Sequence, residues 1–470
     1  MARNVRRVAA ILIVGFIAVA LDLAYWQVAE GPALAENPKY NAYRLSAQER
    51  NTRRGRILDR NGSVLAHSEP TTDGFVRVYP YPPLATVVGY HDPVYGNAGI
   101  EDAFEQYLSG KAGLSLVASL RTRLLHTPTV GSDVVTTIDL QLQKMADAAL
   151  GEGPGAIVVL NPRTGEVLAM ASHPYFDPNT LQRDWPRIRD SGEHPLLNRA
   201  TQGLYTPGSV FKTISLAASL DLGQYTPTTK FTCDDQVVIE GFPIKCDEYS
   251  RGTFDLAHAY AYSCNACFAE VGLRLGGASL TDYARRFGFE APIPLEVPTA
   301  ASQVATTMPE RRLIGSLLAS TAFGQGELLA TPLQMALVAA TIANRGVTPT
   351  PHLVAQVRAE DGVVTYSTPV RPWRTAIRPE TARQVSGMMV RAVESGLASP
   401  AGVPGVSVAG KTGTAELGPG QNSHAWFIGF APADDPEIAI AVVRERGGPG
   451  GTVAAPMARR VIEQALQRAR

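Results

Sequence analysis

The sequence carries no net charge and contains few lysines. Its 43 lysine and arginine residues balance its 43 aspartate and glutamate residues, so the charge gives no reason to expect nucleic acid as a partner. Only seven of the 43 basic residues are lysines, and Lys212 and Lys411 are two of them. An amine that must exchange a proton cannot be replaced by a guanidinium, so the lysines kept in an arginine-rich chain are candidates for chemistry.

Cysteine is also scarce, with four in the chain: Cys233, Cys246, Cys264 and Cys267. The intervening stretches of 12, 17 and 2 residues match zinc sites poorly, so we expect no metal and no cofactor. In an exported chain, disulfides are the better interpretation. Cys233 with Cys246 closes the simplest loop, whereas Cys246 with Cys264 would tie that loop to a candidate active-site segment. The sequence leaves both pairings open.

An apolar stretch follows three arginines at the N-terminus. Positive charge ahead of such a segment keeps the N-terminus in the cytoplasm and exports the rest. We therefore expect residues 1–7 to form a cytoplasmic tail, residues 8–28 a single-pass transmembrane anchor, and the remainder to lie outside the cell membrane. A signal peptide cut after residues 33–35 is the alternative. Tyr25 and Trp26 are typical of an aromatic belt at a membrane interface, and they favour a retained anchor.

Residues 29–133 are too few for a second large enzymatic domain. Asn61-Gly62 lies between the apolar pairs Ile57-Leu58 and Val64-Leu65, which is a strong signal for a β-hairpin. Stretches rich in proline and glycine follow, and then a short helical pattern at 101–108. We interpret this region as a small β-rich pedestal, which holds the main domain off the membrane.

The remainder, residues 134–470, has the pattern of one large α+β domain. Two short apolar runs form an early hairpin, three strand patterns return near the end, and helical periodicity dominates between them. This order predicts one antiparallel five-stranded sheet covered by helices, with a helical subdomain inserted and the active site where the insertion meets the sheet. The expected strands are 156–160, 166–172, 406–417, 425–430 and 438–443; helices are expected at 136–150, over most of 197–396 and from 454, with a β-rich insertion at 231–253.

A serine and a lysine three residues apart stand where a turn leads into an apolar helix. Pro207 and Gly208 break the chain, and apolar residues then recur at helical spacing. Ser209 therefore falls in the first turn of a buried helix, with Lys212 on the same face. A serine needs such a base beside it to act as a nucleophile. Alone, this pattern occurs by chance in a chain of this length and is more typical of a surface helix.

Two further motifs strengthen the interpretation. Ser263-Cys264-Asn265 lies in a polar break between helical stretches, where a hydroxyl and an amide can relay a proton and hold a substrate amide. Lys411-Thr412-Gly413-Thr414 follows a strand pattern, where lysine and threonine can bind a carboxylate and glycine lets a substrate backbone approach. A helix cap would explain the first motif alone, and a solvated strand end the second. All three motifs in this order rarely coincide.

Together the three motifs are the signature of serine penicillin-recognising enzymes, which this sequence resembles. More narrowly, the chain resembles a class B penicillin-binding protein, a monofunctional D,D-transpeptidase of the actinobacterial A type. The resemblance covers nearly the whole chain and departs in small ways, as at Val210, where the family often has threonine. Besides the motifs and the anchor, it rests on the stretches 54–60, 99–101, 136–139, 198–200, 322–326 and 425–430.

The resemblance implies a role for each motif residue. Ser209 would attack the penultimate carbonyl of a D-alanyl-D-alanine stem peptide, with Lys212 as its base and Ser263 passing the proton to the leaving amine. Asn265 would hold the peptide amide. The backbone N–H groups of Ser209 and Thr414 would form the oxyanion hole. The residues expected to bind the substrate carboxylate and backbone are Lys411, Thr412, Gly413 and Thr414.

Other activities compete with crosslinking. A β-lactamase-like hydrolase needs a base for deacylation, yet no glutamate between Asn265 and Lys411 is followed four residues later by asparagine. A D,D-carboxypeptidase would differ only in its acceptor and is harder to exclude. A non-catalytic β-lactam sensor would carry more membrane helices and a His-Glu-x-x-His metalloprotease motif, which the sequence lacks. A cell-wall scaffold would not need all the polar motif residues.

The resemblance also implies partners. Peptidoglycan stem peptides and nascent glycan strands would be the substrates, and β-lactam antibiotics would be inhibitors. Glycan polymerisation would come from a membrane-embedded polymerase of the shape, elongation, division and sporulation (SEDS) group, contacted through the anchor and pedestal. The protein would act in cell wall synthesis, and through it in cell shape or division, with its catalytic domain outside the cell membrane.

Overall fold

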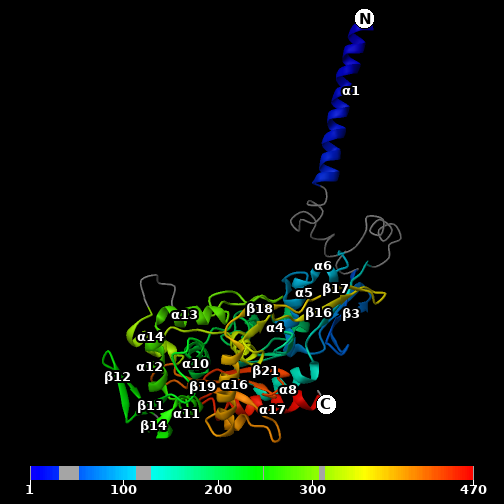
Figure 1. Ribbon diagram of the computed structural model, residues 1–470. Helices are drawn as coiled ribbons and strands as arrows, with labels where there is room; N and C mark the ends of the chain where they lie inside the picture. The colour runs from blue at the N-terminus through cyan, green and yellow to red at the C-terminus, as the bar shows by residue number, and fades with distance from the viewer. Residues whose placement is uncertain (1, 31–51, 113–128, 247, 306–312, 469–470) are drawn as a thin grey trace.

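The computed structural model describes residues 2–30, 52–112, 129–246, 248–305 and 313–468 (Figure 1). Its first helix, α1 (Ala2–Ala24), continues as a short π-helix, η1 (Tyr25–Ala29), and points away from the rest of the chain. The span Arg3–Ala29 is 27 residues long, an 18-residue window within it has a mean hydropathy of 2.5, and none of that window is buried. Its length and composition suit a helix that crosses a membrane. The alternative cleavage site at 33–35 lies outside the described residues.

A five-stranded antiparallel sheet forms the centre of the larger domain. Its strand order is β10–β9–β21–β20–β19, so the early hairpin lies beside the three late strands, as the sequence predicts. Strands β9 and β10 are buried along their whole length, which requires cover on both faces of the sheet. The bounds are β9 (Gly155–Leu160), β10 (Val167–His173), β19 (Ala409–Ala415), β20 (His424–Ala431) and β21 (Ile438–Arg444).

Two pairs of helices supply this cover. Helices α8 and α17 pack against each other and on the sheet, and α15 packs with α16. Helices α15 and α17 both contact β20 and β21. The side chain of Asp139 caps α8, so that helix begins at Leu140 rather than at the predicted residue 136. The bounds are α8 (Leu140–Leu150), α15 (Pro332–Ala343), α16 (Pro379–Glu394) and α17 (Ala454–Arg468).

The helical subdomain lies in the sequence between β10 and β19. Its central helix, α10, is buried from Lys212 to Leu220 and packs against α12, α13 and α16. The predicted β-rich insertion forms two small ladders, β11 with β14 and β12 with β13, on the side of the molecule far from β3 (Figure 1). The bounds are α10 (Lys212–Asp221), α11 (Leu256–Ala261), α12 (Asn265–Leu275), α13 (Gly277–Arg286), α14 (Gly315–Ala322), β11 (Lys230–Cys233), β12 (Gln236–Ile239), β13 (Phe242–Lys245) and β14 (Gly252–Asp255).

A six-stranded sheet builds the pedestal, in the order β17–β16–β8–β2–β3–β4. The hairpin predicted around Asn61-Gly62 is its β2–β3 pair. The prediction of mainly helical structure from 197 to 396 is wrong for residues 347–375, which form β15 to β18. Strand β17 is only four residues long and is exposed at every one, so no buried face marks it. The bounds are β2 (Ile57–Leu58), β3 (Val64–Thr71), β4 (Gly74–Val78), β8 (Asp133–Thr136), β15 (Val347–Pro349), β16 (Val354–Arg358), β17 (Val364–Ser367) and β18 (Pro372–Thr375).

The chain therefore passes from pedestal to main domain within a strand. Strand β8 spans the boundary expected at 133–134, and β16 and β17 reach the pedestal sheet from the main domain. The domain limits stay a prediction. The other elements are β1 (Thr52–Arg53), β5 (Tyr90–Asp92), β6 (Gly96–Ala98), β7 (Thr129–Val130), α4 (Ala85–Val88), α5 (Gly99–Ala103), α6 (Glu105–Leu108), α9 (Leu181–Arg189), and the 3-10 turns η2 (Pro82–Leu84), η3 (Pro178–Thr180), η4 (Gly208–Phe211), η5 (Glu248–Ser250) and η6 (Ser399–Ala401).

A buried ion cluster holds the pedestal together. The carboxylate of Glu101, which is wholly buried, accepts hydrogen bonds from Arg54 Nη2 at 2.7 Å and from Arg77 Nε at 2.6 Å. Burial acts to raise the pKa of Glu101, but the charges of Arg77 and Arg54 outweigh it and hold that pKa below its ordinary value. The carboxylate therefore stays ionised, and its two guanidinium partners fix β4 and the segment before β2 to α5.

Candidate active site

Ser209 lies in the 3-10 turn η4, directly before α10. It is half-buried, while the residues on either side of it are buried, so its hydroxyl is the accessible group of the turn. Gly208 has a φ of 59°, in the left-handed region, and a Cβ there would stand 2.8 Å from the carbonyl oxygen of Thr414. Glycine is therefore required for η4 to pack against β19, which brings the backbones around Ser209 and Thr414 together.

The amine of Lys212 is the centre of the site. Its Nζ lies 3.0 Å from Ser209 Oγ, 3.1 Å from Ser263 Oγ, and 2.6 Å from both the Ser263 carbonyl oxygen and Asn265 Oδ1. Lys212 has no exposed surface, and its Nζ stands 5.6 Å from the centre of the Phe268 ring. The structure thus brings together the two motifs that the sequence separates by more than 50 residues.

The loop between α11 and α12 presents Ser263 and Asn265 to this amine. Ser263 has a φ of 65°, a conformation that non-glycine residues seldom adopt, and Asn265 is the first residue of α12. Cys264 caps α12, because its sulfur accepts the backbone N–H of Cys267 at 3.4 Å. The strained turn therefore points a carbonyl, a hydroxyl and an amide oxygen at one atom.

Strand β19 carries the third motif along the edge of the central sheet. Lys411 and Thr412 are buried, whereas Thr414 is exposed. The Nζ atom of Lys411 donates to the Thr412 carbonyl oxygen at 3.0 Å and lies 5.6 Å from the centre of the Tyr260 ring. An edge strand has main-chain groups available to an extended peptide, so a substrate can add to β19 as a further strand.

Gly413 has a role that the sequence did not indicate. We expected it to let a substrate backbone approach, but a Cβ at this position would stand 2.9 Å from the Pro207 carbonyl oxygen and 3.1 Å from Val210 Cγ1. The missing side chain thus makes room for the segment that carries Ser209. The tight contact joins the third motif to the first.

Four residues that position the site had no role assigned from the sequence, although Gly324 and Trp426 lie in stretches that carry the resemblance. A Cβ on Gly324 would stand 1.7 Å from the Gly208 carbonyl oxygen, so this glycine lets the two segments meet. Trp426 Nε1 donates to the Thr206 carbonyl oxygen at 3.0 Å. Tyr260 and Phe268 are wholly buried beneath the two lysines, and Tyr260 also bonds Thr213 at 2.9 Å. In the sequence, Tyr260 and Phe268 are aromatic residues at helical spacing, a pattern that is typical of any hydrophobic core.

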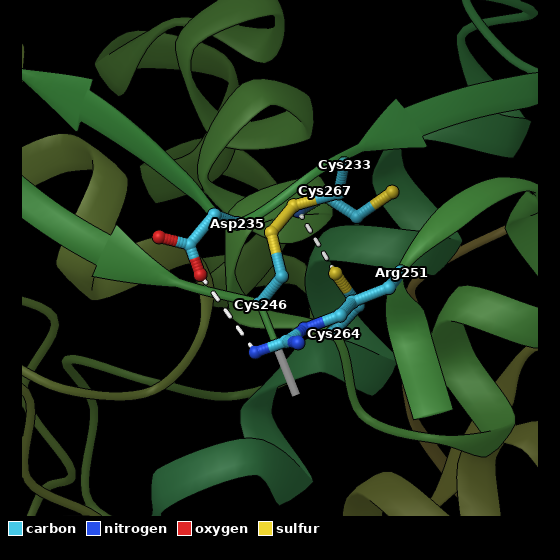
Figure 2. Close-up of a disulfide and its surroundings, with 6 residues drawn as sticks. All are labelled: Cys233, Asp235, Cys246, Arg251, Cys264 and Cys267. Carbon is cyan, nitrogen blue, oxygen red and sulfur yellow. Dashed lines mark hydrogen bonds and ion pairs between the residues drawn. A yellow bond between two sulfur atoms is a disulfide. The ribbon is translucent and has the colours of Figure 1, made fainter. Parts of the chain in front are cut away.

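The four cysteines form one disulfide and one pair of free thiols. Cys233 is bonded to Cys246, which is the simpler of the two predicted pairings, and Cys264 and Cys267 are free and buried (Figure 2). The alternative bond between Cys246 and Cys264 is not formed. Among the described residues, no group of three or more histidine, cysteine, aspartate or glutamate side chains is placed to hold a metal ion.

Comparisons with known proteins agree with this geometry. The family model of the penicillin binding protein transpeptidase domain matches residues 155–463, and that of the penicillin binding protein A dimerisation domain matches residues 54–134. The peptidoglycan D,D-transpeptidase PbpA of Mycolicibacterium smegmatis is 35% identical over an alignment that covers 99% of each chain. The peptidoglycan D,D-transpeptidase MrdA of Acinetobacter baumannii is 30% identical over 76% of this chain and 58% of its own.

Solved structures give the same result. Penicillin-binding protein A from M. tuberculosis, determined as a ceftriaxone acyl-enzyme complex, superposes with a TM-score of 0.83 at 34% identity and covers 90% of this chain and 100% of its own. Its penicillin G acyl-enzyme complex superposes with a TM-score of 0.81. The central sheet, its helices and the pedestal thus form the fold of the penicillin-binding transpeptidases. The chain belongs to the penicillin-binding protein family, among the peptidoglycan D,D-transpeptidases of the PbpA type.

Proposed function

We propose that this protein crosslinks peptidoglycan stem peptides through an acyl-enzyme on Ser209. The observation that carries the proposal is the 3.0 Å contact between Ser209 Oγ and Lys212 Nζ, in a chain whose relatives are peptidoglycan D,D-transpeptidases. A general base must lie within hydrogen-bond reach of the proton that it removes. Ser209 is the nucleophile, and Lys212 is its base.

The surroundings of Lys212 support this assignment. The Ser263 carbonyl oxygen and Asn265 Oδ1, both 2.6 Å from Nζ, are groups that only accept hydrogen bonds. A neutral amine can donate one hydrogen to each of them and keep its lone pair for the hydroxyl proton of Ser209. After it accepts that proton, the ammonium is stabilised by the same oxygen atoms.

The substrate lies along β19 in this proposal. Lys411, Thr412 and Thr414 bind the terminal carboxylate of the stem peptide, and Asn265 holds a peptide amide. As Ser209 Oγ bonds to the penultimate carbonyl carbon, negative charge develops on the carbonyl oxygen. The backbone N–H groups of Ser209 and Thr414 stabilise that charge. The close approach of Gly208 to the Thr414 carbonyl supports this pairing of the two amides.

The acyl-enzyme forms when the bond to the last residue breaks. The Ser263 hydroxyl, 3.1 Å from Lys212 Nζ, passes a proton to the departing amine of D-alanine. An amine of a neighbouring stem peptide then attacks the ester carbonyl, which forms the crosslink and frees Ser209. A β-lactam opens on the same serine and leaves no amine to depart, so its adduct persists.

We further propose that α1 anchors the protein in the cell membrane, with residues 1–7 cytoplasmic and the catalytic domain outside. Three arginines near the N-terminus and the unburied apolar span support this orientation. In this arrangement residues 29–133 form the pedestal and residues 134–470 the transpeptidase domain. The anchor and pedestal contact a SEDS-type glycan polymerase, which supplies the nascent strands.

Intact-mass spectrometry tests the nucleophile. After incubation with benzylpenicillin, wild-type protein should gain the mass of one penicilloyl group, and Ser209→Ala should gain none. Ser219→Ala is the matched control, because Ser219 lies on the same helix but bonds the Leu216 carbonyl oxygen instead. An adduct on Ser209→Ala would refute the assignment.

Acceptor-dependent crosslinking tests the reaction. The wild-type enzyme, given donor stem peptides and an acceptor amine, should form crosslinked dimers and release one D-alanine for each. If D-alanine is released at the same rate with no dimer at any acceptor concentration, the protein is a D,D-carboxypeptidase. Repeated turnover of benzylpenicillin by the wild-type protein would identify a β-lactamase.

A further inference from the structure

A cavity of about 660 Å³ lies where the pedestal meets the main domain. We call it the junction cavity. One wall comes from pedestal residues between 85 and 103, and the other from residue 176 and the segments 196–202 and 292–299 of the main domain. Its volume falls in the range of about 300–1,000 Å³ that is typical of sites for small molecules. None of the motif residues, all of which the structure describes, lines it.

Hydrogen bonds hold the walls of the junction cavity in place. Asn198 Nδ2 donates to the Thr86 carbonyl oxygen at 3.1 Å, which ties the main-domain wall to the pedestal wall. The carboxylate oxygen atoms of Glu296 accept the backbone N–H groups of Leu353 and Val354 at 2.8 and 3.1 Å. The cavity is therefore formed before a ligand binds, and little free energy is spent on ordering it.

The charge of the lining restricts the ligand. No lysine, arginine or histidine is among the described residues that line the junction cavity. The side chains of Asp102 and Gln202 are exposed and make no hydrogen bond or ion pair within the described part of the chain. A negatively charged ligand would meet the Asp102 carboxylate with no cation to offset it, which is costly. The ligand must instead bring hydrogen-bond donors and no negative charge.

An aromatic ring and aliphatic side chains supply the rest of the surface. The Tyr90 ring is half-buried and meets the buried Phe176 ring edge-on, with 6.0 Å between the ring centres, and Leu196 is exposed beside them. A sugar ring has a face of C–H groups and a rim of hydroxyl groups that donate and accept hydrogen bonds. It can lie on the Tyr90 ring while its hydroxyl groups bond to Asp102 and Gln202.

We propose that the junction cavity binds a neutral saccharide, which is a stretch of the N-acetylated glycan strand of peptidoglycan. The identity of the strand rests on the proposed function, because the stem peptides are carried on such strands; the preference for an uncharged polyol does not. Gln202 precedes Ser209 by seven residues, so the strand contacts the segment that leads to the nucleophile. A strand that is bound there raises the effective concentration of its own stem peptides at Ser209.

Isothermal titration calorimetry on the full-length protein in detergent tests the site. The probes are the tetramer of N-acetylglucosamine and glycan strands from which an amidase has removed the stem peptides. Wild-type protein and Ser209→Ala should bind both. Gln202→Ala should weaken binding about three- to tenfold and Asp102→Ala about tenfold or more, the effects of losing one hydrogen bond to a neutral and to a charged group. Gln141→Ala and Asp73→Ala are the matched controls, because both side chains are exposed and lie outside the cavity, and they should keep the wild-type affinity.

The crosslinking reaction gives a second readout. We expect the ratio of the crosslinking rate for strand-borne stem peptides to that for free stem peptides to fall about three- to tenfold in Gln202→Ala. A merely structural role of Gln202 would lower both rates together and leave the ratio unchanged, which would overturn the role of the cavity in crosslinking.

The contrary results are distinct. If the wild type crosslinks strand-borne stem peptides but binds neither probe, the saccharide site is wrong and the proposed function stands. If it binds both probes but crosslinks nothing, the proposed function fails and the site stands. Equal weakening in the control variants would overturn the site. Tighter binding of the cationic glucosamine tetramer, or displacement of the N-acetylated tetramer by a free stem peptide, would refute a neutral saccharide as the occupant.

Discussion

Replacing Gly324 with alanine probes a tight backbone contact beside Ser209. The new Cβ would stand 1.7 Å from the Gly208 carbonyl oxygen, half the distance at which ordinary contact begins. Gly324 also has a φ of 94°, and its carbonyl oxygen accepts the N–H of Gly208 at 2.9 Å. The segment that leads to Ser209 must therefore move. A misplacement of about 1 Å at a reacting atom can cost about 100-fold in rate.

The assay is the second-order rate constant for fluorescent-penicillin labelling, measured beside thermal unfolding. Gly324→Ala should label about 100-fold more slowly while it still unfolds cooperatively, with about 1–2 kcal/mol lost to the left-handed backbone. Gly387→Ala is the control, because Gly387 lies in α16 and a Cβ there meets nothing within 4 Å. It should keep the wild-type rate and gain about 0.5–1 kcal/mol. A folded Gly324→Ala protein that labels at the wild-type rate would refute the reasoning.

Three further changes test other parts of the structure. Lys212→Met keeps an unbranched side chain that is one atom shorter and removes the amine, so labelling should slow by about 100-fold or more. An unchanged rate would exclude Lys212 as the base. Glu101→Gln should cost about 3–5 kcal/mol in urea unfolding at neutral pH. The pKa of Glu101 is lowered in the folded protein. The wild type therefore has this extra stability above pH 4.5 and loses it as the pH falls through the folded pKa. The Glu101→Gln variant should lack this acid dependence. Tyr260→Phe removes the hydroxyl that lies 2.9 Å from the Thr213 hydroxyl and should lower the free energy of unfolding by about 1–3 kcal/mol. An unchanged free energy of unfolding would show that this hydrogen bond does not form in solution.

The sequence predicted the central sheet well because its strands carry strong signals. Residues 156–160 and 438–443 are continuous apolar runs, and the structure buries them at the middle of the sheet. Asn61-Gly62 likewise requires a tight turn wherever it stands between strands. The motif residues were identified because three motifs of serine, lysine and asparagine in this order seldom occur together outside an active site.

Other features could not be predicted because they depend on contacts between distant segments. Strand β17 has no buried face, and its place in the pedestal sheet comes from pairing with β16. Gly324 and Gly208 are 116 residues apart, and only the folded backbone shows that neither has room for a side chain. Tyr260 has the pattern of an ordinary core residue until Lys411 is placed beside it.

The shared pedestal sheet determines how a force applied at the membrane would travel. Strand β2 pairs with β8 in parallel, and β8 pairs with β16 in an antiparallel ladder with one register shift. In the sequence β16 stands between α15 and α16, and α16 packs against β19, which carries Lys411. A tilt imposed on the pedestal would therefore reach the substrate strand through paired backbone as far as β16 and through the packing of α16 on β19. The pedestal sheet and the substrate strand are thus mechanically coupled, although they lie in different parts of the sequence.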